Sequence, residues 1–526
     1  MMDVLYFFDV PVWILLAVTL VTLLYIYGTQ THSVWRKLGI PGPRPLPFLG
    51  NAHEIRRLGM AEAFRQWGER YGPVVGVFFM RRPMLVINDV NMLKQILITD
   101  FHNFTNRGSP IPKAFMDDVF GNCLLFVEGE EWKRLRGILS PIFTSARLRE
   151  KSVLINKACN KTVGTLLDAS HQRERVPIDV IFRKFTIDVI LSSLLSIDPD
   201  GNAAATELFQ QHVPKMIRPS PWRLKMFLLS GMFPFLSPVL GKLADESQDA
   251  REFYISFISQ IAEKRRGAPE GTYKDFLENM AEAEIDDCAE SRTKLTFKEL
   301  VSQASLFFLA GNDTSSFVLT VLAYLLARHQ DIQDRLVAEI KRELGSDLSE
   351  DTSFKGKTTP LLNYDSIQKL HFMKACVLEA LRLHPVISVF TRQALESTEI
   401  SGYPIPAGAG VYVPVKSVCS DPDLYPEPEL FKPERFLKDH LENQVTDPAG
   451  GVGLGSSMFL PFGVGPRNCI GMRLGLFQVM MVMAAVLRKV RFVSAPGEFK
   501  LPRAVMFGIP PFSEPVMVEV EAREEH

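Results

Sequence analysis

One long apolar run constrains the fold of this chain more than any other feature. Residues 300–328 form a helical pattern, and Thr296 with Glu299 three positions later makes a capping box before it. A helix of about 30 residues exceeds the ordinary globular length. Its middle, residues 304–309, is nearly all apolar. The sequence therefore predicts a helix that runs buried through the centre of a domain.

The other periodic segments favour a mainly α fold with a smaller β part. A short β-hairpin is expected near residues 74–88, with its turn at 81–83. Prolines crowd residues 417–436, which indicates irregular but ordered structure. Residues 450–457 lack a preceding strand and a following helix, so their glycines are no dinucleotide site. Further helices are predicted over residues 330–344, 364–383 and 472–490.

Charge and cysteine usage exclude several classes of protein. The 526 residues carry a net charge of −1, so no general attraction to nucleic acid follows. The six cysteines are scattered and form no C-x-x-C pair, which argues against zinc sites and a disulfide framework. Reduced thiols in a cytosol-facing domain are the simplest interpretation.

The amino terminus has the composition of a membrane anchor. Residues 10–27 carry no charge and would span about 27 Å as a helix, against about 30 Å of bilayer hydrocarbon. Asp9 is placed to cap this helix, and Pro11 falls in its first turn. Arg36 and Lys37 follow the run, which puts the remaining chain in the cytosol. A cleaved signal peptide fits poorly, because its basic residues precede the apolar run.

We expect three divisions of the chain: an anchor over residues 1–35, a connector over 36–50 and one catalytic domain over 51–526. Four prolines alternate between residues 41 and 47 and make the connector stiff. Its expected role is to hold the domain at a set angle to the membrane. The alternative is an arbitrary proline-rich linker.

A single cysteine, Cys469, lies in a glycine-flanked loop before the helical pattern at 472–490. Phe462 is placed to pack beside its sulfur, and Gly465 lets the backbone approach closely. Arg467 could pair with a carboxylate of a cofactor. This arrangement suits a haem iron, which takes one thiolate ligand. The alternative is a buried structural cysteine.

The long helix contains unexpected polar residues at its centre. Gly311 costs about 1 kcal/mol relative to alanine within a helix. Asp313 and Thr314 add a further cost in an apolar setting unless they are hydrogen-bonded. A tolerated kink is one interpretation. The other is a widened turn that makes room for O2, with Asp313 and Thr314 supplying protons.

The pattern F-x-x-G-x-R-x-C-x-G at residues 462–471 resembles the haem-binding signature of the cytochrome P450 family. Residues 310–314 resemble its oxygen-handling motif, and the similarity covers essentially the whole chain. The sequences at residues 131–136 and 139–145 are similar to those of the microsomal clan that includes the vertebrate family-three drug-oxidising enzymes and thromboxane synthase. One departure is Cys419-Ser420, where many relatives carry His-Arg.

The resemblance assigns two further groups of residues. Glu379 and Arg382 share a helix face, and with Arg435 they resemble the structural Glu-Arg-Arg network of the family. The expected propionate-binding residues are Trp132, Arg136, Arg107 and Arg392. An exposed basic helix remains the alternative for Lys133 and Arg134, which could face a redox partner.

The resemblance implies a single cytochrome P450 catalytic domain that holds haem b, with Cys469 as the axial ligand. It implies insertion of one oxygen atom from O2 into an apolar substrate of the xenobiotic, steroid or fatty-acid type. Electrons would come from an NADPH-dependent flavoprotein reductase, with cytochrome b5 as an additional donor. The implied location is the endoplasmic reticulum membrane, with one span, a cytosolic catalytic domain and no nucleic-acid partner.

Two other classes stay open. A haem-thiolate isomerase would act on an endoperoxide or hydroperoxide, although such members often lack the Asp-Thr pair that this chain retains. A non-catalytic haem protein is the third possibility. The apolar stretch 221–240 is either membrane-contacting or core, and residues 111–126 are expected to line the pocket; neither segment names a substrate.

Overall fold

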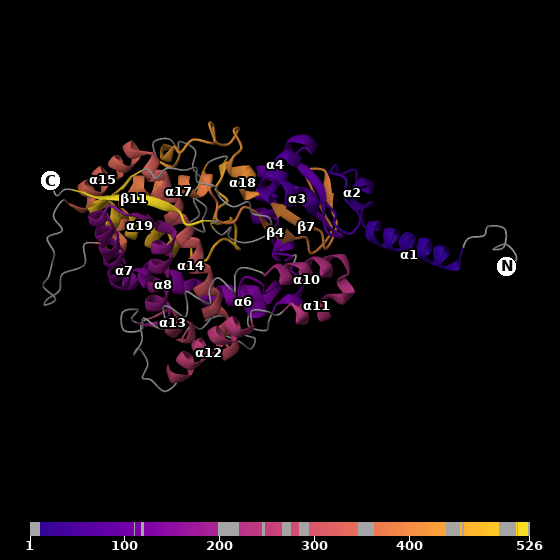
Figure 1. Cartoon of the computed structure of the whole chain (residues 1–526), viewed down its shortest axis with the longest axis horizontal. Coiled ribbons are helices and arrows are strands. Elements are labelled where there is room, and N and C mark those ends of the chain that lie inside the picture. Colours follow the sequence, from indigo (N-terminus) through magenta and orange to yellow (C-terminus); the bar gives the residue numbers. More distant parts are fainter. Residues whose placement is uncertain are drawn as a thin grey trace.

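The chain is described by a computed structural model (Figure 1). Asp9, the predicted cap of the first helix, lies outside the described residues. The structure describes residues 11–109, 111–116, 120–197, 220–244, 248–265, 275–282, 294–345, 362–437, 453–454, 457–493, 512 and 514–523.

Helix α14 (Phe297–Arg328) is the long predicted helix, and it crosses the centre of the molecule (Figure 1). Its capping box is confirmed: the Thr296 hydroxyl accepts the Glu299 N–H at 3.3 Å, and a Glu299 carboxylate oxygen accepts the Thr296 N–H at 2.7 Å. Most of its residues are buried, because other helices surround it. Those packed against it include α8 (Ile178–Leu195), α17 (His371–Leu383) and α19 (Met472–Lys489).

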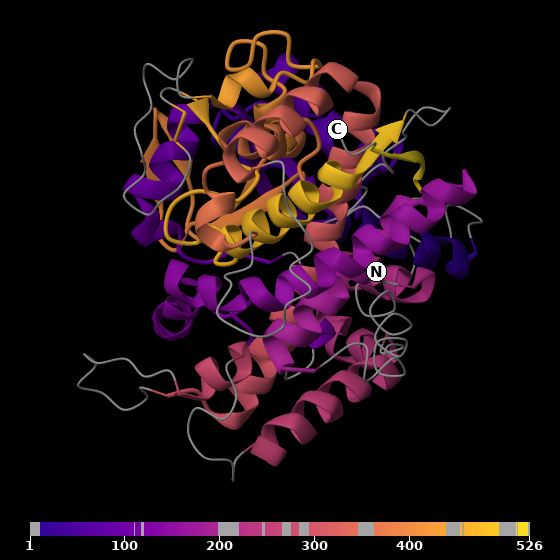
Figure 2. The same cartoon turned by 90° about the vertical axis from the view of Figure 1, so that its left-hand side faces the viewer.

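The remaining helices pack around this centre. Figure 2 shows α19 lying beside the purple helices of the first half, where it packs along α7 (Ser145–Gln172). Towards the anchor lie α2 (Val34–Lys37), α3 (Ala52–Leu58), α4 (Met60–Tyr71) and α5 (Val90–Lys94). The others are α6 (Gly129–Leu139), α10 (Pro221–Met232), α11 (Ser237–Leu243), α12 (Gln248–Arg265), α13 (Phe276–Glu282), α15 (Gln330–Leu344), α16 (Tyr364–Ile367) and α18 (Val415–Cys419).

The predicted helix over 364–383 is wrong in one respect: it is broken into α16 and α17. The Glu339 carboxylate of α15 accepts the backbone N–H groups of Phe372 at 2.7 Å and Met373 at 2.9 Å. These are N–H groups that the first turn of a helix leaves without partners. A side chain 33 residues upstream thus provides the cap that starts α17. The predicted helix 472–490 ends at Lys489, because Val490 begins a strand.

The predicted hairpin is confirmed as β1 (Val74–Phe79) and β2 (Arg82–Ile87). Its turn is tighter than expected, since Arg82 and Pro83 already pair with Phe79 and Phe78. The β part is also larger than residues 74–88. Strand β2 pairs in parallel with β7 (Gly410–Val413), which pairs with β4 (Phe390–Gln393).

Three smaller sheets lie elsewhere in the described chain. The largest joins distant segments in the order β10 (Val490–Val493), β11 (Met517–Ala522), β3 (Arg175–Pro177). The others are two-stranded: β5 (Thr398–Ile400) with β6 (Tyr403–Ile405), and β8 (Gly453–Leu454) with β9 (Ser457–Met458). The irregular segment 417–436 contains only α18's end and the 3-10 helix η8 (Pro433–Phe436).

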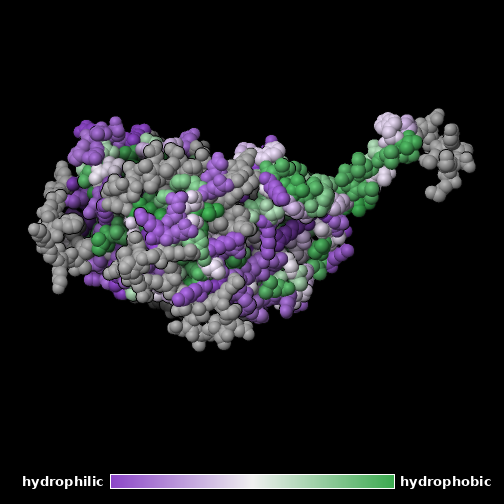
Figure 3. Space-filling view, turned by 90° about the horizontal axis from the view of Figure 1, so that it is seen from below, coloured by the Kyte–Doolittle hydropathy of each residue, from purple (hydrophilic) through white to green (hydrophobic). Residues whose placement is uncertain are grey.

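Helix α1 (Val12–Thr29) leaves the body as an apolar arm and is almost entirely exposed (Figures 1 and 3). It is long and apolar enough to cross a membrane. Pro11 precedes its first turn rather than lying within it. The chain that follows α1 packs on β1: the indole of Trp35, just before the connector, donates to the Val77 carbonyl at 3.0 Å, and a Cβ on Gly42 of the connector would lie 1.9 Å from the Gly76 oxygen. This segment is therefore part of the folded body.

Candidate active site

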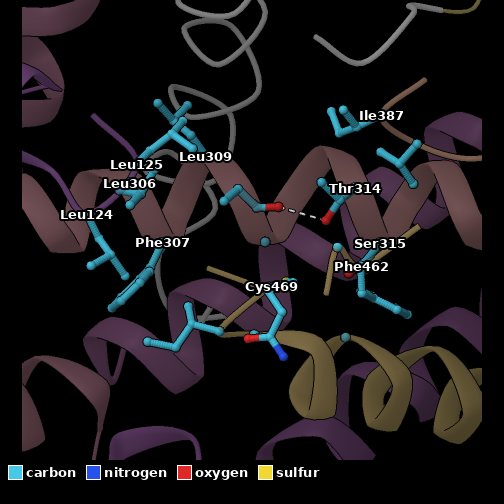
Figure 4. A pocket seen from close by; sticks show the side chains of 18 of the residues that line it. Leu124, Leu125, Leu306, Phe307, Leu309, Thr314, Ser315, Ile387, Phe462 and Cys469 are labelled. Carbon is cyan, nitrogen blue, oxygen red and sulfur yellow. Dashed lines mark hydrogen bonds between the residues drawn. The ribbon is translucent and has the colours of Figure 1, made fainter. Parts of the chain in front are cut away.

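A cavity of about 730 Å³ lies between α14 and the Cys469 loop (Figure 4). Its walls are mainly apolar, and among the described lining residues there is no carboxylate. This size and character suit a drug-sized apolar ligand. The prediction for residues 111–126 is confirmed outside residues 117–119, which the structure does not describe, because the lining includes Ile111, Phe115, Met116, Leu124, Leu125 and Phe126.

The Cys469 loop is held by its own backbone. The Cys469 N–H donates to the Phe462 carbonyl at 2.8 Å, and the Asn468 N–H donates to the Gly465 carbonyl at 3.0 Å. Gly465 has a φ of +73°, and a Cβ there would lie 1.9 Å from the Leu97 oxygen. Only glycine fits this position. The loop therefore holds Cys469 in one orientation at the start of α19.

Cys469 borders the cavity, whereas the other described cysteines, Cys123, Cys159, Cys376 and Cys419, are buried. Burial within the protein raises the pKa of the Cys469 thiol, and the Gly471 N–H bonded to the sulfur and the nearby Arg136 and Arg107 oppose that shift. These groups favour the thiolate form. The thiol is thus presented to the cavity with donors and cations already placed around its sulfur.

Three arginines, the half-buried Arg107 and the buried Arg392 and Arg467, line the same cavity, and no described carboxylate forms an ion pair with them. Arg392 is 1% exposed and Arg467 is 3% exposed. The Nε atoms of Arg107, Arg392 and Arg467, and Nη1 of Arg467, are buried without hydrogen-bond partners. Burial, and the nearby charge of Arg136, lower the pKa of Arg107 to about 10. Burial, and then the charges of Arg107 and Arg136, lower the pKa of Arg467 to about 9, against the opposing charge of Glu128.

Burial and the charges of Arg107 and Arg467 also hold the pKa of Arg392 well below its usual range. Removing one partner of a buried ion pair typically costs about 3–5 kcal/mol. No carboxylate among the described residues forms an ion pair with these three guanidinium groups, so an anion bound from outside the chain would stabilise them. A group with two carboxylates beside Cys469 fits both the charge and the donors, so the residues present suit a haem with its propionates.

Helix α6 connects the arginines to the cysteine loop. The Arg136 guanidinium donates to the Asn468 carbonyl at 3.0 Å and to its side-chain oxygen at 2.7 Å. The guanidinium carbon of Arg467 lies 4.4 Å from the centroid of the Trp132 ring. Trp132 and Arg136 both line the cavity, as the sequence suggested, but Arg136 also fixes the loop that carries Cys469.

Thr314 faces the cavity, and its hydroxyl donates to the Ala310 carbonyl at 2.7 Å (Figure 4). The expected widened turn is absent from α14, which stays α-helical from Phe297 to Arg328. Room at this point comes instead from Gly311, which lines the cavity and where a Cβ would lie 3.0 Å from Ile190.

Asp313 is not among the described residues that line the cavity. Its carboxylate accepts the Asn312 side-chain N–H at 3.0 Å. The Asn312 oxygen in turn accepts the Thr186 hydroxyl of α8 at 2.7 Å. The acid thus belongs to a polar chain on the α8 side of α14, one residue from the hydroxyl in the cavity.

The sequence did not single out Gln303, which is fully buried on α14. Its side-chain oxygen accepts the Leu124 N–H at 2.8 Å, and its nitrogen donates to the Asn122 carbonyl at 3.1 Å. The side-chain amide of Gln303 thus joins the pocket loop, residues 111–126, to the central helix α14. The only signal was a polar residue in an apolar run. Gln478 of α19, hydrogen-bonded to Ser315 of α14, was missed for the same reason.

The predicted ion-pair network is present: it joins Glu379, Arg382 and Arg435. The Arg382 guanidinium donates to both oxygens of Glu379, at 2.7 and 2.8 Å, and neither side chain is exposed. Arg435 donates to Glu379 at 3.3 Å. Arg382 also donates to the Cys419 carbonyl at 2.8 Å. Arg382 contacts the backbone of Cys419, not its side chain. The bond therefore forms although this chain has Cys419-Ser420 where many relatives have His-Arg.

Comparison with known proteins finds similarity along nearly the whole chain. A sequence model described as Cytochrome P450 matches residues 40–513. The chain is 34% identical to Cytochrome P450 3A29 of Sus scrofa, over 99% of each chain. It is 35% identical to Cytochrome P450 3A7 of Homo sapiens, over all of this chain and 99% of the relative. Cytochrome P450 3A27 of Oncorhynchus mykiss is 31% identical over 99% of this chain and 97% of its own length.

Proposed function

Because this chain belongs to the cytochrome P450 family, we propose that its cavity oxidises apolar compounds of drug, steroid or fatty-acid type. The chain is a haem-dependent monooxygenase, and its family binds haem b through a cysteine thiolate. One observation carries the proposal. A cysteine and three arginines with unpartnered buried guanidinium nitrogens line a mainly apolar cavity of about 730 Å³.

We assign the haem to this end of the cavity. Cys469 supplies the axial thiolate, and Arg107, Arg392 and Arg467 bind the propionates. Trp132 and Arg136 complete that set, Phe462 lines the cavity near the sulfur, and Gly465 lets the cysteine loop pack closely against Leu97. Bound haem supplies O2 activation, for which the thiolate donates electron density to the iron. The Glu379–Arg382–Arg435 network supports the loop structurally.

Thr314 and Asp313 deliver protons in this proposal. The Thr314 hydroxyl lies at the cavity wall and is held by the Ala310 carbonyl. Asp313 is joined through Asn312 to Thr186, which forms a polar route beside α14. When the Thr314 hydroxyl turns from the Ala310 carbonyl towards the cavity it can donate its proton there, and Asp313, one residue away, is the acid that supplies the next proton. The surrounding apolar walls exclude water, so that protons enter by this route.

Electrons would come from an NADPH-dependent flavoprotein reductase, with cytochrome b5 as an additional donor. Support comes from the sequence, which offers no nucleotide fingerprint of its own. A candidate contact is the exposed Lys133 on α6, close in sequence to the Arg136 that holds the cysteine loop. Partner binding at this face would place the electron donor near the haem edge.

The proposed location is the endoplasmic reticulum membrane, with α1 as a single span and the catalytic domain in the cytosol. Residues 1–35 then form the anchor, 36–50 the connector and 51–526 the catalytic domain. The α10–α11 region supports membrane contact rather than core: Phe235 is 69% exposed and Val239 is 58% exposed. Tyr27 of the anchor stacks on Phe233 of this region, with ring centroids 6.0 Å apart.

A reconstituted turnover assay tests the function. We expect oxidised product from a lipophilic steroid or drug only when NADPH, the reductase and O2 are all present. Product formed from a hydroperoxide without any reductant, and none from the complete system, would instead establish the isomerase.

Cys469→Ser tests the site. This variant should lose the thiolate signature of the reduced carbon monoxide complex. Cys419→Ser, at a buried cysteine outside the cavity, is the matched control and should retain that signature. An unchanged spectrum in Cys469→Ser would remove the assignment of the axial ligand.

A further inference from the structure

The turn between β1 and β2 places a cation at the base of the anchor helix. Arg81 is only 9% exposed, and its guanidinium carbon lies 3.6 Å from the centroid of the Tyr27 ring, near the end of α1. The hydroxyl of Thr31, just beyond the anchor, donates to the Arg81 carbonyl at 2.8 Å. Side chain and backbone together fasten this turn to the anchor.

The Arg81 guanidinium has no anionic partner within the described part of the chain. Its Nε is buried without a hydrogen-bond acceptor, as is the Nε2 of the nearby His32. Burial, and then the charge of Arg81, lower the pKa of His32, so the site holds one positive charge at neutral pH. Buried charges are normally paired. By contrast, Arg382 in the core has the Glu379 carboxylate.

The anchor fixes the depth of Arg81 relative to a bilayer. The 18 residues of α1 span about 27 Å, close to the hydrocarbon thickness of about 30 Å. Tyr27 therefore falls at the membrane–water interface, where tyrosine rings concentrate. Arg81 stacks on that ring and lies at the level of the lipid phosphates. Figure 3 shows the apolar arm of α1 meeting the body at this base.

We propose that Arg81 binds the phosphate of a phospholipid headgroup and thereby sets the tilt of the catalytic domain on the membrane. The proposal rests on the membrane-spanning role of α1 proposed above. A guanidinium suits this ligand, because its planar fork donates two parallel N–H bonds to phosphate oxygens. The phosphate supplies the anion that the described chain lacks, and the Tyr27 ring holds the fork in place.

The neighbouring residue provides a matched control. Arg82 is the first residue of β2, and its side chain makes a different contact from that of Arg81. The Arg82 guanidinium donates to the Ser109 carbonyl at 2.9 Å. Arg82→Gln and Arg81→Gln therefore remove the same charge from adjacent positions, but only the second removes the proposed contact.

The direct test is solid-state NMR of the full-length holoenzyme with ¹⁵N-labelled arginine, in phosphatidylcholine bilayers and phosphate-free buffer. We expect one guanidinium signal to be attenuated by lipid ³¹P in the wild type, lost in Arg81→Gln and retained in Arg82→Gln. Equal attenuation in the wild type and Arg81→Gln would overturn the proposal and leave Arg81 as a stacking partner of Tyr27. The readout needs no turnover, so it is separate from a failure of the proposed oxidation.

Two further measurements complete the test. In phosphorus-free detergent with added inorganic phosphate we expect no such attenuation; an equal effect there would indicate general anion binding and contradict the lipid assignment. In oriented bilayers the haem-plane angle should shift in Arg81→Gln but not in Arg82→Gln. An unchanged angle would overturn the orienting role. The reduced carbon monoxide spectrum of each variant verifies that it is folded.

Discussion

At the scale of single residues, local motifs were more informative than isolated polar side chains. Cys469, Arg467 and Gly465 stand within ten residues of one another, so their shared loop could be predicted from the sequence. Gln303 could not, because its partners Leu124 and Asn122 lie about 180 residues away. Its role depends on tertiary contacts that no local spacing reveals.

Gln303→Leu should weaken substrate binding without loss of haem. The change removes the acceptor of the buried Leu124 N–H, at about 1–3 kcal/mol. We expect the pocket loop to loosen and the Kd of a lipophilic ligand, measured by spectral titration, to rise about tenfold or more. Gln303→Glu keeps the acceptor for Leu124 and should show a smaller effect. Equal Kd values in all three proteins would contradict the role of Gln303.

At the scale of elements, periodicity predicted most helices but not their tertiary interruptions. Residues 330–344 agree with α15 at both ends, because their amphipathic pattern is local. The break between α16 and α17 depends on Glu339, which packs there only in the folded protein. Likewise, the β1–β2 hairpin is local, whereas its partner β7 comes from more than 300 residues later. Long-range pairing has no signature in a short window.

Glu339→Ala should destabilise the start of α17. It removes the acceptor of two buried N–H groups, and loss of such a cap costs about 0.5–2 kcal/mol. The thermal unfolding midpoint should fall, whereas Glu339→Gln, which keeps one acceptor, should recover part of the loss.

The same carboxylate predicts a pH dependence. Burial raises the pKa of Glu339 above its ordinary value of 4.5, against the opposing Phe372 and Met373 N–H bonds. At a pH somewhat above 4.5, Glu339 is therefore protonated more in the folded protein than in the unfolded chain. The contribution of Glu339 protonation to the free energy of unfolding thus increases as the pH falls towards 4.5. Wild type should gain stability relative to Glu339→Gln between neutral pH and pH 5. A constant difference in midpoint would contradict this assignment.

At the scale of the whole molecule, buried charges connect the site to the scaffold around it. In the described part of the chain the three arginines at the cavity form no ion pair with a carboxylate, whereas Arg382 is fully paired by Glu379. We expect the first group to be stabilised by the bound cofactor, whereas the second joins α17 to η8 and to the segment at Cys419. The resemblance identified both groups, but only the structure separates the paired arginines from the unpaired ones.

Glu379→Ala should therefore affect the whole protein rather than one step of catalysis. It leaves Arg382 buried without its carboxylate, which typically costs about 3–5 kcal/mol. We expect a lower unfolding midpoint and a reduced haem content in the purified protein. Glu434→Ala is the matched control, because that glutamate makes a more exposed pair with Arg335 and should cost about 0–1 kcal/mol. Full haem content and an unchanged midpoint in Glu379→Ala would show that the network does not support the cysteine loop.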